Sequence, residues 1–258
     1  MGQGQTGAGA GHLQVRAGAL AAALLAFVSL GSRATTSLPE VAVDVHDKAS
    51  LQRGARLFVN YCLSCHSATY MRFSRLARDL DIPEAVAKQN LMFVSDKIGD
   101  TMQVSMNPRE AETWFGVVPP DLSVLARARG VDWVYAFLTS FYRDPSRPNG
   151  VNNLMLRNTA MPHVLWELQG WQEPVIENKP NESGQPVETV VGVELAEPGA
   201  LGAEEFKAAV RDLVGFLSYV SEPAKPLRQR VGFWVLGYLA VFLAVAYLLK
   251  REYWRDVH

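Results

Sequence analysis

Residues 62–66 of the chain read Cys-Leu-Ser-Cys-His, and they contain the only two cysteines among its 258 residues. The pattern Cys-x-x-Cys-His is typical of the covalent attachment site of a c-type haem. Two thiols about one helical turn apart can each form a thioether to a haem vinyl group, and the imidazole of the next residue then lies under the iron. The motif therefore predicts that Cys62 and Cys65 carry one haem c and that His66 is an axial ligand of its iron.

A zinc site or a thioredoxin-type redox pair is the alternative use of two such cysteines. Zinc would normally need a second pair of ligands, and the chain has no further cysteine. The other histidines occur singly, at His12, His46, His163 and His258. If haem takes both thiols, no disulfide can form, and the fold must be stabilised by packing and by the haem itself.

Residues 1–35 resemble a secretion signal. Arg16 is followed by an apolar run over 17–30 and then by small residues up to Ala34. The run is short and Ala-rich for a membrane span, so we expect cleavage near Ala34, with an uncleaved anchor as the alternative. Export agrees with the haem motif, because haem c is attached on the outer face of the bacterial inner membrane.

A second apolar segment lies near the C-terminus. Residues 231–249 read VGFWVLGYLAVFLAVAYLL, a run of 19 residues without a charge, long enough to span most of a bilayer core of about 30 Å. Aromatic residues mark both ends, as in interfacial belts. A buried core helix would not be apolar on every side. We predict a transmembrane anchor over 227–250 and a cytoplasmic tail over 251–258. Basic residues flank both ends, so this orientation rests on the exported haem.

Residues 36–226 are long enough for one well-buried domain, which we expect in the periplasm. The whole chain has a formal net charge of −1 and shows no basic patch, which disfavours a nucleic-acid partner. Apolar spacing and capping residues predict a mainly α fold. The expected helices run from a cap at Asp47 or Ser50 to Cys62, over 84–92, from Pro119-Pro120-Asp121 to near Gly130, over 133–142 after a cap at Asp132, and over 204–220. Residues 143–150 are predicted to be a loop.

An electron-transferring haem iron needs a sixth ligand, for which a methionine thioether is the usual choice. Met155 and Met161 lie in a long non-helical stretch, and Met161 precedes a proline that stiffens the backbone. Residue chemistry favours Met161 over Met155. His163 is a rival that would give bis-histidine ligation.

The chain resembles the cytochrome c1 family, the haem-carrying subunits of the quinol–cytochrome c oxidoreductase (bc1) complex. The resemblance rests on 61–67 (YCLSCHS), 70–73 (YMRF), 119–123 (PPDLS), the pair Arg127 and Arg129, 160–162 (AMP) and the C-terminal span. These motifs cover most of the mature chain in the family's order. His163 departs from the family pattern, in which proline or alanine is frequent at this position.

The resemblance implies a class I cytochrome c-like haem domain with loop or β-hairpin insertions. It implies His66 and Met161 as axial ligands, and an arginine of the Arg-Ala-Arg sequence on a haem propionate. Arg129 is the first choice for that contact, with solvent exposure of both arginines as the alternative. Trp133 either donates to the same propionate or packs in the core. Pro120 is expected to shape the wall over the haem.

Residues 172–205 carry eight glutamates against one lysine. The alternating segment 187–195 predicts a strand or hairpin. The stretch is either a solvated surface insertion or an acidic docking surface that steers a basic cytochrome.

The resemblance implies an electron-transfer subunit without substrate chemistry of its own. Its partners would be cytochrome b, a Rieske iron–sulfur protein that donates electrons, a cytochrome c that accepts them, and the bacterial inner membrane. Two rival functions stay open at this point. One is a stand-alone, membrane-anchored c-type cytochrome, and the other is a haem enzyme or gas sensor with an open sixth position.

Overall fold

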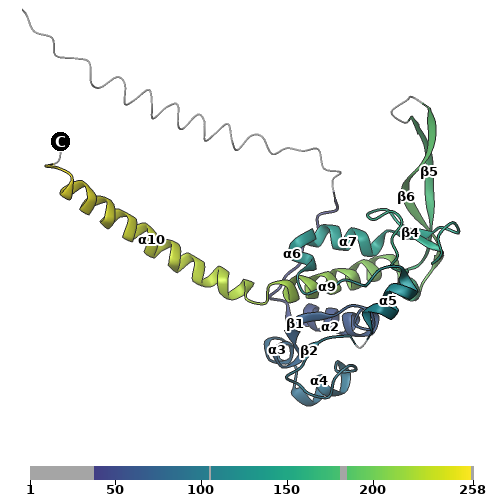
Figure 1. The fold of residues 1–258 in the computed structure, drawn as a ribbon, viewed down its shortest axis with the longest axis horizontal. Coiled ribbons are helices and arrows are strands. Elements are labelled where there is room, and N and C mark those ends of the chain that lie inside the picture. The colour runs from purple at the N-terminus through teal and green to yellow at the C-terminus, as the bar shows by residue number, and fades with distance from the viewer. Residues whose placement is uncertain (1–37, 105, 181–184, 257–258) are drawn as a thin grey trace, which may run out of the picture. The chain divides into compact units, whose positions relative to one another are not determined.

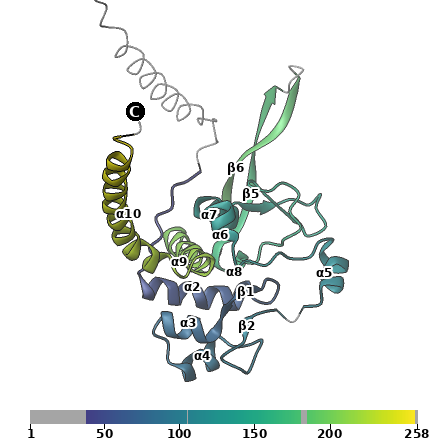
Figure 2. The ribbon, with the colours of Figure 1, turned by 60° about the vertical axis from the view of Figure 1, so that its left-hand side comes forward.

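The computed structural model describes residues 38–104, 106–180 and 185–256. The predicted signal over 1–35 lies outside the described residues. The chain divides into a unit ending at Leu38 and a main unit from Pro39 onward, and the elements below belong to the main unit. Figures 1 and 2 show their arrangement. The helices are α2 (Lys48–Tyr61), α3 (Phe73–Asp79), α4 (Glu84–Asn90), α5 (Pro108–Phe115), α6 (Leu125–Arg129), α7 (Val131–Thr139), α8 (Trp166–Gln169), α9 (Ala203–Ser221) and α10 (Lys225–Tyr253).

The strands form three antiparallel pairs, β1–β2, β3–β4 and β5–β6. Their bounds are β1 (Ala68–Arg72), β2 (Thr101–Met102), β3 (Phe141–Arg143), β4 (Val151–Asn153), β5 (Gly170–Pro180) and β6 (Pro186–Pro198). Most of the secondary structure is helical, as the sequence predicts. The class I cytochrome c-like architecture remains a prediction.

The core is built on the packing of α2 against α9. Helix α2 begins as predicted, because the Asp47 carboxylate accepts a hydrogen bond from the Ser50 N–H at 3.1 Å. Phe58 lies on its buried face, with its ring 5.5 Å from that of Phe216 in α9. At Gly54 the two helices approach so closely that an added Cβ would run into the backbone carbonyl of Asp212. This crossing fixes the direction of α2 and therefore the position of residues 62–66, which follow directly after it.

Helix α9 confirms the amphipathic pattern predicted over 204–220. Its apolar stripe is buried, and α6 and α7 also pack against it. Asp212 ties it to α2, since its carboxylate accepts a hydrogen bond from Ser50 Oγ at 2.6 Å and pairs with Arg53.

Two predicted helix boundaries are wrong. The helix expected from Pro119 begins only at Leu125, because groups that would form its first turn are bonded elsewhere. Ser123 N, which would donate to Pro119 O in such a helix, donates to the Asp121 carboxylate at 2.7 Å. Pro120 O, which would accept the next helical hydrogen bond, lies 2.7 Å from His66 Nδ1.

The helix expected over 133–142 is instead α7, Val131–Thr139. Asp132 is not its cap, because the Asp132 carboxylate accepts a hydrogen bond from Val41 N at 2.7 Å, and Gly130 precedes the helix. The helix ends early because Phe141–Arg143 pairs with Val151–Asn153 in an antiparallel ladder. Residues 144–150, within the predicted loop, connect these two strands.

Strands β5 and β6 pair along their length as an antiparallel hairpin, and β6 confirms the strand predicted over 187–195. Side chains alternate between its two faces. Glu173 and Glu194 lie directly opposite each other on one face, and Ile176 and Leu195 lie on the other, 53% and 49% exposed. Residues 176–180 of β5 and 186–188 of β6, at the end of the hairpin away from Gly170, are exposed.

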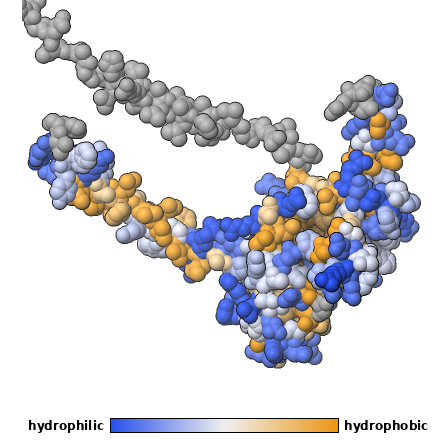
Figure 3. Space-filling model, viewed as in Figure 1, coloured by the Kyte–Doolittle hydropathy of each residue, from blue (hydrophilic) through white to orange (hydrophobic). Residues whose placement is uncertain are grey.

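Helix α10 is long and apolar enough to cross a membrane, and it is the one such helix among the described residues. The most apolar stretch of this helix has a mean hydropathy of 2.2, and none of that stretch is buried. Phe233 and Trp234 are about four-fifths exposed, at 81% and 80%. Figure 3 shows the hydrophobic colour along this helix. These properties fit the predicted C-terminal anchor.

Candidate haem site

The Cys-x-x-Cys-His motif continues the last turn of α2. Cys62 N donates to Phe58 O at 2.8 Å, and His66 N donates to Cys62 O at 2.8 Å. This helical turn brings the two cysteines one turn apart, as thioether attachment to one porphyrin requires. Cys62 is buried, Cys65 is half-buried, and neither is in a disulfide. Burial raises the pKa of the Cys62 thiol to about 12, so this thiol is neutral at physiological pH.

The imidazole of His66 is oriented by a backbone carbonyl. Its Nδ1 lies 2.7 Å from the carbonyl oxygen of Pro120, and because a carbonyl can only accept, Nδ1 carries the hydrogen. Burial lowers the pKa of His66, an effect that the hydrogen bond to Pro120 opposes in part. The neutral imidazole then has its lone pair on Nε2, which is the state and orientation that a metal-ligating histidine needs.

The segment 119–123 (PPDLS) is held against residues 67–70 by a set of hydrogen bonds. The Asp121 carboxylate accepts from Thr69 N at 2.9 Å and from Thr69 Oγ1 at 2.8 Å. Ser123 Oγ accepts from Tyr70 N at 3.0 Å. Burial acts to raise the pKa of Asp121, but the bonds from Ser123 and Thr69 outweigh it and hold the pKa below its usual value. Residues 119–123 therefore fix Pro120 relative to His66, a role that sequence reasoning missed.

Met161 is half-buried and packs against the hydrophobic core that includes Cys62 and Leu63. Met155 is also half-buried, but it is not part of that packing among the described residues. The two methionines therefore differ in their packing, and the choice of Met161 over Met155 as the iron ligand stays a prediction.

His163 is 4% exposed and enclosed by aromatic rings. It stacks on Phe141 with ring centroids 5.2 Å apart and meets the edge of Trp171 at 5.8 Å. Burial lowers its pKa to about 4, which the nearby Gly170 backbone opposes weakly. Neither ring nitrogen makes a hydrogen bond of normal geometry with any described residue. The ring is thus neutral and packed between Phe141 of β3 and Trp171 of β5.

Both arginines of the Arg-Ala-Arg sequence are exposed. The guanidinium carbon of Arg129 lies 5.0 Å from the ring centroid of Trp133, a cation–π contact that orients the side chain. No carboxylate of the described chain is within ion-pair distance of Arg129, so its donors can bind an anionic group. The positive charge of Arg127 contributes instead to the lowered pKa of Glu222, behind the larger effect of Arg228.

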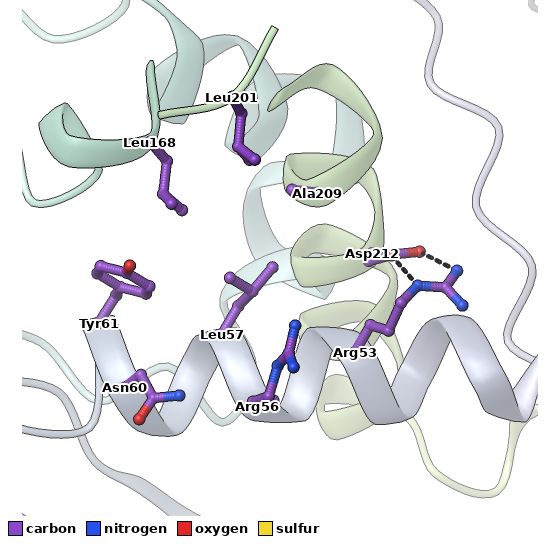
Figure 4. Close-up of a pocket in the computed structure, with 9 residues that line it drawn as sticks. All are labelled: Arg53, Arg56, Leu57, Asn60, Tyr61, Leu168, Leu201, Ala209 and Asp212. Carbon is purple, nitrogen blue, oxygen red and sulfur yellow. Dashed lines mark hydrogen bonds and ion pairs between the residues drawn. The ribbon is translucent and has the colours of Figure 1, made fainter. Parts of the chain in front are cut away.

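Two other features of the described chain do not provide a haem or metal site. Among the described residues, no group of three or more His, Cys, Asp or Glu side chains could hold a metal ion, so a zinc use of the cysteines finds no further ligands there. A cavity of about 380 Å³ lies beside α2 and α9, with the Arg53–Asp212 ion pair at its rim, and Leu168 and Leu201 opposite (Figure 4). None of the predicted haem residues lines it, so we do not place haem there.

A covalent attachment motif at the end of a buried helix, together with a C-terminal apolar helix, is the combination that characterises membrane-anchored c-type cytochromes. The model of the Cytochrome C1 family matches residues 40–169 and 197–257, and the chain belongs to this family. Family membership makes it a haem protein of electron transport and implies covalently bound haem c. The family model leaves residues 170–196 unmatched, a range that includes β5 and most of β6.

Relatives named cytochrome c1 agree with this assignment over most of the chain. Cytochrome c1 of Allochromatium vinosum is 48% identical over 229 residues, which cover 89% of this chain and 93% of that protein. Cytochrome c1 of Blastochloris viridis is 28% identical over 82% of each chain. A protein of Nitrosomonas europaea named ammonia monooxygenase gamma subunit is 47% identical over 93% of this chain and 97% of its own length.

Proposed function

We propose that this chain is the haem-carrying electron-transfer subunit of a quinol–cytochrome c reductase (bc1 complex). In this proposal a Rieske iron–sulfur protein donates electrons to it, a cytochrome c accepts them, and cytochrome b is its partner in the membrane. The observation that carries the proposal is the family match, whose two stretches include all the predicted haem residues and the C-terminal helix. The relative named cytochrome b/c1 from Bradyrhizobium diazoefficiens supports a partnership with cytochrome b.

The donor chemistry of this chain fits a haem c. We assign Cys62 and Cys65 as the thioether carriers and His66 and Met161 as the axial ligands. One Cys-x-x-Cys-His motif in the sequence corresponds to one haem. The haem supplies the reversible change between ferric and ferrous iron. No residue of this chain acts as a nucleophile or general base in this function.

The residues around the motif have positioning and charge-balancing roles. Pro120 O accepts the Nδ1 hydrogen of His66 and so keeps Nε2 free for the iron. Arg129, oriented by Trp133, would donate to a haem propionate and offset its charge. Leu63 and Met161 belong to apolar surroundings, which exclude water from the site and raise the reduction potential.

We further propose that the haem domain, residues 36–226, lies in the periplasm of a bacterium, and that residues 227–250 cross the inner membrane. The tail, 251–258, is then cytoplasmic, and residues 1–35 are a signal. Protease treatment of intact spheroplasts tests this topology. The haem domain should be degraded while an epitope placed after His258 survives, and the reverse pattern would contradict the orientation.

The proposed function is tested by purifying the tagged, full-length chain from membranes in mild detergent. We expect a haem-stained polypeptide that stays coloured after denaturation, because thioether bonds survive it. Cytochrome b and an iron–sulfur subunit should be recovered with it. Recovery of the chain without them would support a stand-alone cytochrome instead. Recovery with subunits of an ammonia-oxidising enzyme would favour the activity named for the Nitrosomonas relative.

The axial ligand is tested separately by Met161→Leu, with Met155→Leu as the matched control. We expect Met161→Leu to lose the long-wavelength charge-transfer band of a methionine–iron bond and to lower the reduction potential, because the thioether raises it. Met155→Leu should keep both properties. A parent-like Met161→Leu variant would show that another residue is the ligand.

A further inference from the structure

The segment that carries Met161 has no regular secondary structure between β4 and α8, yet its backbone is fixed by side chains. Asn153 is fully buried, and its side-chain oxygen accepts hydrogen bonds from Met155 N at 2.8 Å and Leu156 N at 3.2 Å. Asn152 Oδ1 accepts from Asn158 N at 2.7 Å. These two asparagines fix the beginning of the segment to the end of β4.

Asn149 reaches closer to the predicted ligand. Its side-chain nitrogen lies 3.4 Å from the carbonyl oxygens of Thr159 and Ala160 and 3.3 Å from that of Met161. The two N–H groups of one amide are therefore shared among three successive carbonyls. Asn149 belongs to the loop between β3 and β4, so a residue remote from the haem motif holds the backbone on the amino side of Met161.

The carboxyl side of Met161 is held by a different kind of contact. His163, two residues on, inserts its ring between Phe141 of β3 and Trp171 of β5. Trp171 is itself braced by Arg143, whose guanidinium carbon lies 5.0 Å from the indole centroid and which pairs with Glu197 at 2.8 Å. Trp171 lies in the segment that the family model leaves unmatched. Trp171, at the start of β5, thus supports the carboxyl end of the segment between β4 and α8 that carries Met161.

We propose that Asn149 and His163 are positioning residues that hold the backbone on either side of Met161 and so keep its thioether on the haem iron. This inference rests on the proposed function, in which Met161 is the ligand. A neutral thioether is a weak ligand, and its bond persists when the segment that carries it is already ordered. If the segment is loosened, other ligands compete with the thioether more successfully.

The test compares haem-loaded, full-length variants in detergent by their affinity for imidazole, which displaces a methionine from ferric haem. We expect Asn149→Ala and His163→Ala each to bind imidazole about tenfold more tightly, since each loses contacts worth roughly that factor in the equilibrium. His163→Phe keeps an aromatic ring in the stack and should stay within about twofold of the parent. The variant that binds imidazole most tightly should have the lowest reduction potential, and the variant that binds it most weakly should have the highest.

Asn90→Ala is the matched control for Asn149→Ala. Asn90 also donates from its side-chain amide to a backbone carbonyl, that of Val86, at 3.0 Å, but it does so on the exposed surface of α4. Its loss should leave the imidazole affinity unchanged. If His163→Ala fails to fold, Trp171→Ala removes the same contact from the other side. It should also raise the affinity for imidazole.

Met161→Leu in the same series separates this inference from the proposed function. If Met161→Leu keeps the methionine–iron band, the ligand assignment is wrong. If Met161→Leu loses the band while Asn149→Ala, His163→Ala and Trp171→Ala bind imidazole like the parent, the ligand assignment holds and the positioning role is overturned. A parent that lacks the methionine–iron band, and whose haem spectrum changes in His163→Phe but not in Met161→Leu, would make His163 itself the ligand and would also overturn it.

Discussion

Replacing Gly54 by alanine is expected to destabilise the domain, although alanine is the better helix former. Gly54 lies in the middle of α2, where α9 crosses it. A Cβ built on Gly54 meets the backbone carbonyl of Asp212 and lies 2.7 Å from the Cβ of Phe216. A backbone carbonyl within a helix cannot rotate out of the way as a side chain can. The two helices must therefore move apart.

The magnitude follows from two opposing effects. Alanine gains about 1 kcal/mol over glycine in a helix interior. Overpacking a filled core costs typically about 1–3 kcal/mol and more where the obstacle is rigid. Because the obstacle here is main chain, we expect a net loss of about 2 kcal/mol, which lowers the unfolding midpoint of a domain of this size by about 4–8 °C. Helix α2 also carries Cys62 at its end, so a smaller share of the variant should acquire haem.

Urea unfolding of the haem-loaded proteins in detergent, followed by circular dichroism, measures this difference. The matched control is Gly215→Ala in α9, where the nearest atoms to an added Cβ are the side chains of Leu51 and Val43, both at 3.9 Å. That distance is ordinary contact, so this variant should be as stable as the parent or more stable by up to about 1 kcal/mol. If Gly54→Ala proves as stable as Gly215→Ala, the close helix crossing is not what this structure describes.

Further predictions concern the hydrogen bonds of residues 119–123 and the hairpin. Asp121→Ala should lower the free energy of unfolding by about 2 kcal/mol, since it removes three hydrogen bonds. Asp121→Asn should retain part of this stabilisation. Because the folded-state pKa of Asp121 is below its usual value, its stabilisation is present above that usual value and is lost as the pH falls through the folded pKa. The difference between parent and Asp121→Ala should therefore shrink below about pH 4 in urea titrations. Arg143→Gln should speed amide hydrogen exchange at residues 170–173 and leave the global stability unchanged, because an exposed ion pair contributes little. Replacing residues 175–192 by Asn-Gly closes the hairpin at the Pro174–Val193 pair and should leave one covalent haem per chain by mass spectrometry. Loss of the haem there would show that the end of the hairpin is needed for attachment.

The parts of the fold that the sequence predicts well are those with local causes. Helices α2 and α9 follow from apolar residues at helical spacing, and the start of α2 follows from the Asp47 cap. The anchor helix α10 follows from composition alone. The haem motif is equally local, because the spacing of Cys62, Cys65 and His66 already contains its chemistry.

The parts that could not be predicted depend on partners far away in the sequence. Pro119-Pro120 has the appearance of a helix start, but Pro120 O is used by His66, 54 residues earlier. Asp132 has the appearance of a helix cap, but its carboxylate bonds to Val41 N, 91 residues away. A capping residue has the same local pattern whether its acceptor serves its own helix or another segment. The burial of His163 between two aromatic rings had no signal in the sequence either.

The two proposed axial ligands are held in physically different ways, and this difference decides which of them can vary. His66 is oriented by a main-chain carbonyl, so no replacement of the Pro120 side chain removes the acceptor unless the backbone moves. The segment that carries Met161 is held by the amide of Asn149 and the ring of His163. Each of these two groups can be removed by one substitution. Residues that contact an axial ligand tune the reduction potential of the haem. Substitutions that leave the Cys-x-x-Cys-His motif intact should therefore change the potential chiefly when they affect the residues that hold Met161. A set of single variants around Met161 should accordingly spread over a wider range of potentials than an equal set around Pro120.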